Sequence, residues 1–167
     1  MHHGLMSLII IKIYRFFWRL KFLVSILLLF ILFYLFPALI LIPVNIFSNA
    51  SQLITPSILE KLSFWRTCII SPFIETLLFQ FSLYILLRKI FEIKSVFLII
   101  ILSSIIFSLF HYFSIAYILY TFCAGIILNF TYIFSIKKLK NTYFAFLIVW
   151  GIHIFKNLIA FFVNTML

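Results

Sequence analysis

Acidic side chains are scarce in this sequence, with three Asp or Glu among 167 residues against 13 Lys or Arg. Only 10% of the residues are charged, 66% are hydrophobic, and the mean hydropathy is +1.31. This composition excludes an ordinary soluble domain. The two cysteines, Cys68 and Cys123, both lie in apolar surroundings. They are typical of small core residues, which excludes a disulfide framework and a zinc knuckle.

Long apolar runs take up most of the chain, at about 22–42, 67–87, 95–113, 115–136 and 142–163. A helix needs roughly 20 apolar residues to cross about 30 Å of hydrocarbon, and lipid offers its backbone no other hydrogen-bond partners. The runs therefore predict an all-α, polytopic membrane helical bundle of about five transmembrane helices. The first run is longer than the roughly 7–15 apolar residues of a signal peptide, so we expect it to be retained.

The segment 45–66 differs from these runs because it contains Asn, Ser, Thr and Pro. Thr55 and Pro56 are typical of a helix start, since Thr can cap and Pro suits the first helical position. Ile58, Leu62 and Trp65 then fall on one helical face. A short helix lying at the membrane interface and an ordinary loop are equally favoured interpretations.

We expect a single membrane domain over 1–167. Its parts are a basic N-terminus with the first span at 1–44, the connecting segment at 45–66, and a four-helix core at 67–163.

Basic residues cluster where the five expected spans return to one side of the membrane. Ten Lys and Arg fall on that side: 12, 15, 19, 21, 88, 89, 94, 137, 138 and 140. This bias predicts an integral membrane protein with its N-terminus in the cytoplasm and its C-terminus outside, and we expect the membrane to be a bacterial cytoplasmic membrane. The net charge of +10 then reflects topology and contacts with lipid headgroups, and we expect no nucleic-acid partner.

Five polar residues are not explained by membrane insertion: Glu75, His111, His153, Lys156 and Asn157. An ionisable group inside a span is costly, so each is a functional hypothesis. Glu75, His111 and His153 lie roughly 20–25 Å from the basic side if each residue rises 1.5 Å along a straight helix. Three polar side chains on three helices are thus predicted to share one depth.

Helical spacing also predicts which of these residues face each other. His153 and Asn157 are four residues apart, as are Phe107 and His111, so each pair lies on one face of its helix. Three structural alternatives remain open. Glu75 can form a structural ion pair with Lys156, and His111 can be an interfacial residue. His153 and Asn157 can supply hydrogen bonds between helices.

Three short stretches, "SPFIETLLFQ", "FSLFH" and "HIFKN", resemble the motifs of the CAAX-protease and bacteriocin-processing (CPBP, or Abi) family of intramembrane proteases. The resemblance covers about 67–163. The matching positions are Pro72 with Glu75, Phe107 with His111, and His153 with Asn157.

Two positions depart from the family pattern. Thr76 stands where the family has a second Glu, and Gln80 stands where it has an Arg. The exchange replaces a buried ion pair by two neutral side chains that can still hydrogen-bond, so no charge is stranded. The change at these two positions leaves open whether the protein has full catalytic activity.

The resemblance implies hydrolysis of a peptide bond inside the membrane. In that assignment Glu75 is the general base that activates water, His111 orients the water or relays a proton, and His153 and Asn157 donate hydrogen bonds to the oxyanion. Thr76, Gln80, Phe107 and Lys156 form the supporting shell. The cofactor stays open, because Glu75, His111 and His153 can hold a divalent metal such as zinc, and a metal-free glutamate mechanism is equally plausible.

The expected substrate is a lipidated or membrane-associated peptide, such as a prenylated protein tail or a leader peptide. The alternative is a non-catalytic membrane protein of the same family that acts in bacteriocin self-immunity or as a partner of a peptide exporter. An ion-coupled transporter is disfavoured, since the sequence shows no inverted repeat.

Overall fold

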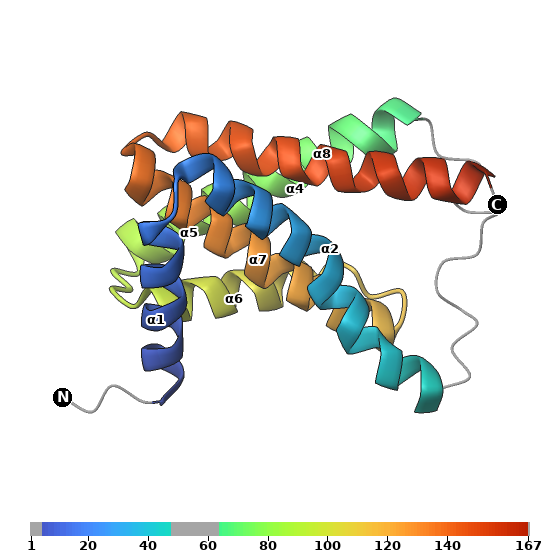
Figure 1. Ribbon diagram of the computed structural model, residues 1–167, viewed down its shortest axis with the longest axis horizontal. Helices are drawn as coiled ribbons and strands as arrows, with labels where there is room; N and C mark the ends of the chain where they lie inside the picture. Colours follow the sequence, from blue (N-terminus) through green and yellow to red (C-terminus); the bar gives the residue numbers. More distant parts are fainter. Residues whose placement is uncertain (1–4, 48–63, 167) are drawn as a thin grey trace.

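The computed structural model of the protein describes residues 5–47 and 64–166. Every regular element in these two ranges is a helix, and together the helices form one bundle (Figure 1). The bundle contains α1 (Leu5–Arg19), α2 (Phe22–Phe47), α6 (Val96–Leu109), α7 (Ile115–Leu139) and α8 (Thr142–Met166). A further continuous helical stretch runs from Arg66 to Ile90. The all-α membrane bundle predicted from the sequence is therefore confirmed.

Three helical stretches in the described ranges are long and apolar enough to cross a membrane: Arg66–Ile90, Ile115–Leu139 and Thr142–Val163. Of the other two predicted spans, α2 has 26 residues and covers the apolar run 22–42, whereas α6 has 14 residues and is shorter than the run 95–113. The protein is an integral membrane protein. Within the two described ranges, the five apolar helices overlap the five apolar runs of the sequence.

The helix α1 was not predicted, because we treated the basic N-terminus as a flank of the first span. The backbone changes direction between α1 and α2 at Leu20, whose N–H donates to the carbonyl oxygen of Phe17. Ser25 of α2 is fully buried and its hydroxyl donates to the same carbonyl. Lys138 of α7 donates to the carbonyl of Trp18, where a cation favourably meets the negative end of a helix dipole. These contacts fix α1 across the end of the bundle.

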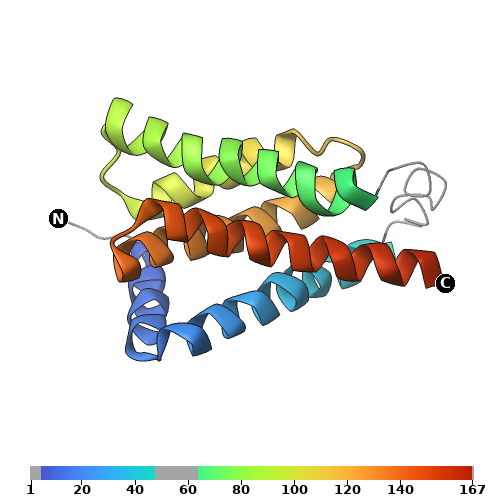
Figure 2. The same cartoon turned by 90° about the horizontal axis from the view of Figure 1, so that it is seen from above.

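The helix α7 is the centre of the bundle and packs against α2, α6 and α8 (Figures 1 and 2). Its side chains Leu128, Tyr132 and Phe134 are completely buried. Gly125 lets α6 come close, since a Cβ there would lie 3.0 Å from a ring carbon of Phe107 and 3.2 Å from Cα of Ser104. Small residues allow such close approach between helices in membranes, where packing drives association.

The stretch Arg66–Ile90 alternates between tight and wide helical turns. In chain order it consists of η1 (Arg66–Ile70), α4 (Ser71–Glu75), η2 (Thr76–Ser82), α5 (Leu83–Ile85) and η3 (Leu86–Ile90), where η marks the wider π-helical turns. Pro72 lacks a backbone N–H and therefore cannot complete the hydrogen-bond ladder of the turn before it. Figure 2 shows this stretch lying beside α8.

The connecting segment lies almost entirely outside the described residues, so the choice between an interfacial helix and a loop at 45–66 remains a prediction.

Candidate active site

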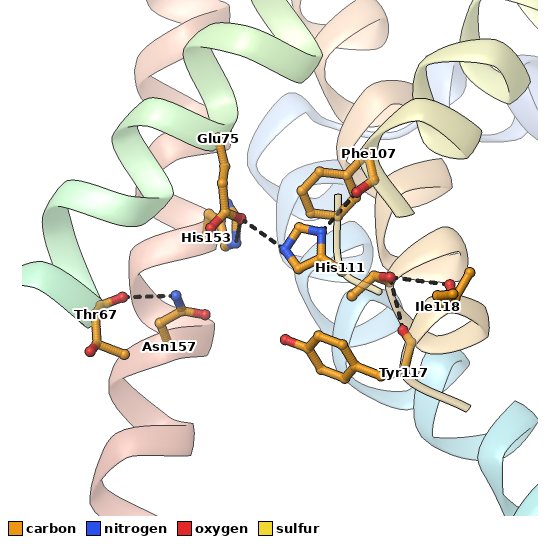
Figure 3. Close-up of polar contacts among 9 residues, drawn as sticks. Thr67, Glu75, Phe107, His111, Tyr117, Ile118, His153 and Asn157 are labelled. Carbon is orange, nitrogen blue, oxygen red and sulfur yellow. Dashed lines mark hydrogen bonds and ion pairs between the residues drawn. The ribbon is translucent and has the colours of Figure 1, made fainter. Parts of the chain in front are cut away.

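Glu75, His111 and His153 come together in one cluster between three helices (Figure 3). The carboxylate Oε2 of Glu75 lies 3.8 Å from Nε2 of His111 and 3.5 Å from Nε2 of His153. Glu75 ends α4, His111 follows α6, and His153 lies in the middle of α8. The structure therefore unites the three side chains that the sequence predicted to share one depth.

His111 lies in a turn and not on a helix, which corrects the predicted span of 95–113. The helix α6 ends at Leu109, and the N–H of His111 bonds to the carbonyl of Ser108 in a tight final turn. Nδ1 of its ring is 2.7 Å from the carbonyl oxygen of Phe107. The last carbonyls of a helix lack partners within the helix, so a side chain commonly satisfies one of them.

The hydrogen bond to Phe107 determines the tautomer of a neutral His111. A carbonyl oxygen only accepts, so Nδ1 carries the hydrogen and Nε2 presents a lone pair. That lone pair faces the carboxylate of Glu75. The ring of Phe107 also packs on the imidazole, with 4.5 Å between the centroids, as the spacing of the two residues predicted.

His153 is the most enclosed member of the cluster, with 4% of its surface exposed. Its ring meets Phe33 and Phe107 edge to face, at centroid distances of 6.1 and 6.5 Å. Its Nδ1 has no hydrogen-bond partner among the described residues. An unpaired lone pair costs less against aromatic carbon than an unpaired N–H, so we place the hydrogen on Nε2, directed toward Glu75.

Asn157 is held one turn away from this cluster by a backbone carbonyl. Its Nδ2 donates to the oxygen of Thr67 at 3.0 Å. That oxygen is available because of Pro72: the N–H of Ser71 bonds to Arg66, and Pro72 has no N–H to offer at the next position. The proline of the first sequence motif thus leaves the acceptor that fixes the asparagine of the third.

Lys156 does not pair with Glu75. In the part of the chain that the structure describes, the ionic contacts of Glu75 are with the two histidines alone. The ammonium of Lys156 instead lies over the rings of Phe33 and Tyr120, 4.7 and 4.6 Å from their centroids. The structural ion pair left open by the sequence is therefore not the arrangement observed.

Thr76 and Gln80 are both completely buried. The hydroxyl of Thr76 and both polar atoms of the Gln80 amide lack hydrogen-bond partners among the described residues. The structure therefore does not show the hydrogen bonding that the sequence allowed for this neutral pair. The wide turn η2 (Thr76–Ser82) changes the residue spacing, so two side chains four apart no longer lie directly above each other.

Tyr117 is a residue of this site that sequence reasoning missed. The ring centroids of Tyr117 and His111 are 5.8 Å apart, and the hydroxyl points toward Asn157 (Figure 3). Ser114 caps the start of α7 by accepting a hydrogen bond from the N–H of Tyr117. A serine three residues before a tyrosine at the start of an apolar run was the available signal.

The described residues contain no group of three His, Cys, Asp or Glu arranged to hold a metal ion. Nε2 of both histidines approaches the same oxygen of Glu75, and Nδ1 of His111 is already bonded to a carbonyl. The bond from Nδ1 to a carbonyl leaves Nε2 of His111 directed at Glu75, an arrangement that serves a bound water as well as a metal ion, and the metal-free glutamate mechanism is the one developed under Proposed function.

A family model described as type II CAAX prenyl endopeptidase, Rce1-like, matches residues 56–159. The match spans more than half of the chain and includes all three motifs. A comparison with curated proteins finds no match, and a comparison with solved structures finds none either.

Proposed function

The chain belongs to the Rce1-like family of type II CAAX prenyl endopeptidases, and from this we propose that it hydrolyses a peptide bond of a lipidated or membrane-associated peptide, using Glu75 to activate water. The family is one of intramembrane endopeptidases. Our proposal adds which residues carry out the hydrolysis and which class of peptide is cleaved.

The observation that carries the proposal is the pair of acceptors facing each other across 3.8 Å, Oε2 of Glu75 and the Nε2 lone pair of His111. This separation is too long for a direct hydrogen bond and suits a bridging water. A water that donates one hydrogen to each acceptor has its own lone pairs left for attack. Glu75 and His111 therefore orient the nucleophile, and Glu75 accepts its proton.

In the first chemical step the water oxygen bonds to the scissile carbonyl carbon while Glu75 takes one water proton. Glu75 then returns this proton to the peptide nitrogen, the C–N bond breaks, and a carboxylic acid and an amine leave. General-base assistance of this kind contributes about 10²- to 10⁴-fold to the rate. His153 positions the carboxylate through its Nε2–H, which lies 3.5 Å away.

Negative charge on the carbonyl oxygen needs hydrogen-bond donors. Asn157 uses one of its two amide hydrogens on Thr67, and we assign the second to the oxyanion. The hydroxyl of Tyr117, which points toward Asn157, is the second donor. This assignment moves His153 from the oxyanion to the support of Glu75. Removal of one such donor typically costs about 2.7–4 kcal/mol of transition-state stabilisation.

The test is hydrolysis of two candidate peptides by purified protein, one with a prenylated C-terminal tail and one with a leader sequence. Glu75→Gln keeps the shape of the side chain and removes the base, so we expect a loss of at least about 10²-fold in kcat. Glu92→Gln is the matched control, because Glu92 is exposed in the turn before α6. Hydrolysis that survives Glu75→Gln contradicts the proposal.

A second candidate function rests on the departure at Thr76 and Gln80. In this alternative the protein is a non-catalytic member of the family, acting in bacteriocin self-immunity or with a peptide exporter. The same substitution separates the two functions in cells. A Glu75→Gln protein of normal abundance that still supports the cellular phenotype favours the alternative.

A further inference from the structure

An apolar cavity of about 270 Å³ lies between α1, α2, α6 and α7, and no residue of the candidate active site lines it. Buried side chains form part of its wall, among them Phe17, Ile100 and Ile127. Ile13 and Leu32 also line the cavity and are exposed, so it opens to the surface of the bundle. Every described residue that lines it is apolar, and a cavity of this kind accepts hydrocarbon in preference to water.

A second cavity, of about 420 Å³, lies at the basic end of the bundle. Its polar lining consists of three cationic side chains, Arg15 and Arg19 of α1 and Lys137 of α7, beside the rings of Tyr14 and Trp18. All three cations are exposed, and none of them forms an ion pair with a carboxylate within the described ranges. Like charges gathered in one place repel each other, so an anion bound among them is favoured.

The basic cavity and the apolar cavity are neighbours. Val96 lines the basic cavity, and Ile100, one turn further along α6, lines the apolar one. Tyr14 of the basic cavity meets Phe130 of the apolar cavity edge to face, with 6.4 Å between the ring centroids. A single ligand with a charged end and an apolar end can therefore reach both cavities.

The length of the combined site matches one leaflet of a bilayer. On α7 the lining extends from Lys137 in the basic cavity to Ile126 in the apolar cavity, which corresponds to about 16 Å of helix. Half of a hydrocarbon layer about 30 Å thick is about 15 Å. The cationic end lies where the headgroups of the leaflet on the basic side are expected, and Trp and Tyr rings favour that level of the membrane.

We propose that the two cavities bind one anionic phospholipid of the leaflet on the basic side, with its phosphate at Arg15, Arg19 and Lys137 and one acyl chain in the apolar cavity. A guanidinium group can donate two parallel hydrogen bonds to a phosphate, and basic pockets between membrane helices suit phospholipid headgroups. Membrane topology requires basic residues on this side, but it does not require a cavity that gathers three of them beside an apolar one. The inference does not depend on the proposed hydrolysis.

The test measures the binding of phosphatidylglycerol and of phosphatidylcholine with identical acyl chains to the purified full-length protein in non-ionic micelles. Each Lys or Arg beside an anionic lipid contributes about fivefold in affinity, so three of them predict a preference for phosphatidylglycerol of about 10- to 100-fold. The preference should fall as the salt concentration rises, since salt screens exposed charges. Equal affinity for the two lipids overturns the inference, and this comparison needs no variant.

A charge variant and a matched control locate the headgroup. The combined substitutions Arg15→Gln, Arg19→Gln and Lys137→Gln should remove most of the preference for phosphatidylglycerol. The control replaces by Gln three exposed lysines of the same side that do not line the basic cavity: Lys21, Lys89 and Lys140. It removes the same charge and should leave the preference intact. An equal loss in both triple variants overturns the inference, because binding would then follow net surface charge.

A second pair of variants locates the acyl chain. Leu32→Trp should fill part of the apolar cavity and lower the affinity for phosphatidylglycerol by about 10-fold or more, since each buried methylene contributes about fourfold. Leu35→Trp is the control, because Leu35 is exposed on the same helix and does not line the cavity. Equal affinities of these two variants overturn the inference.

Two competitors test other occupants of the site. Soluble glycerol phosphate carries the anion without an acyl chain, and a prenylated peptide carries an apolar chain without the phosphate. Neither should displace phosphatidylglycerol at equal concentration. Displacement by glycerol phosphate would identify a site for free phosphate, and displacement by the peptide would identify a site for the substrate chain; either result overturns the inference.

Discussion

Substitution of Gly125 by alanine is expected to disturb the site from the centre of the bundle. The added Cβ would lie 3.0 Å from Cδ1 of Phe107 and 3.2 Å from Cα of Ser104. Ordinary van der Waals contact between carbons requires about 3.5–4.0 Å. The ring can rotate away, but a backbone atom cannot move without its helix, so α6 must shift by several tenths of an ångström. Phe107 and the following His111 move with it.

The magnitude follows from two opposing effects. Overpacking a well-packed core typically costs about 1–3 kcal/mol, whereas replacing Gly by Ala inside a helix gains about 1 kcal/mol. We therefore expect a net loss of about 0–2 kcal/mol in the free energy of unfolding for Gly125→Ala. Gly151→Ala is the matched control, since nothing lies within 4 Å of a Cβ at that position of α8. It should gain up to about 1 kcal/mol.

Reversible unfolding in mixed micelles measures both stabilities, and turnover of the prenylated peptide measures the effect on the site. Gly125→Ala should unfold more easily than Gly151→Ala by about 1–3 kcal/mol and should lower kcat, because the acceptor formed by His111 moves relative to Glu75. Equal stability and equal turnover of the two variants would show that α6 and α7 are not packed as closely as described. The reasoning from Gly125 would then be wrong.

Three further outcomes are expected. Thr76→Val and Gln80→Met should each raise the free energy of unfolding by about 1 kcal/mol or more in the same assay, because they remove buried polar atoms that lack partners; a loss of stability would reveal partners for these atoms. His111→Asn should lower the single-turnover rate by about 10²- to 10⁴-fold, and an effect on KM alone would remove His111 from the chemistry. Treatment with a chelator should leave peptide cleavage unchanged, with metal content measured on the same sample; a loss that zinc reverses would disprove the metal-free reaction.

The proximity of Glu75, His111 and His153 could be predicted, because residue counts from the basic side and the fixed rise of a helix assign them to one depth. The same reasoning placed the ring of Phe107 against His111. Neither step needs knowledge of how the helices rotate about their axes. The match of the family model over residues 56–159 agrees with the three motifs.

The partners of Lys156 and Asn157 could not be predicted, since both depend on the rotation and contacts of α8. His153 and Lys156 are three residues apart, so spacing alone allows either of them to face Glu75. The structure directs the histidine to the carboxylate and the lysine to aromatic rings. The bond from Asn157 to Thr67 further requires a helical turn widened before Pro72, which no local propensity indicates.

The end of α6 was also missed, because the apolar run continues through Phe110 and Phe113 without a change in character. Hydrophobicity decides which segments enter the membrane, but the hydrogen bonds of the final turn decide where the helix stops. Here Nδ1 of His111 forms a hydrogen bond with the carbonyl oxygen of Phe107, and Ser114 caps the start of the next helix.

The shortness of α6 has a consequence for the surrounding lipid. Its 14 residues rise about 21 Å, whereas the hydrocarbon layer is about 30 Å thick. Phe110, Tyr112, Phe113 and Ile115, which follow the helix, are all highly exposed. Such a hydrophobic mismatch is relieved when the bilayer thins locally. Short acyl chains would lower the cost of that thinning beside His111 and long chains would raise it, so membrane thickness becomes a variable that tunes how easily a peptide in the bilayer reaches the carboxylate.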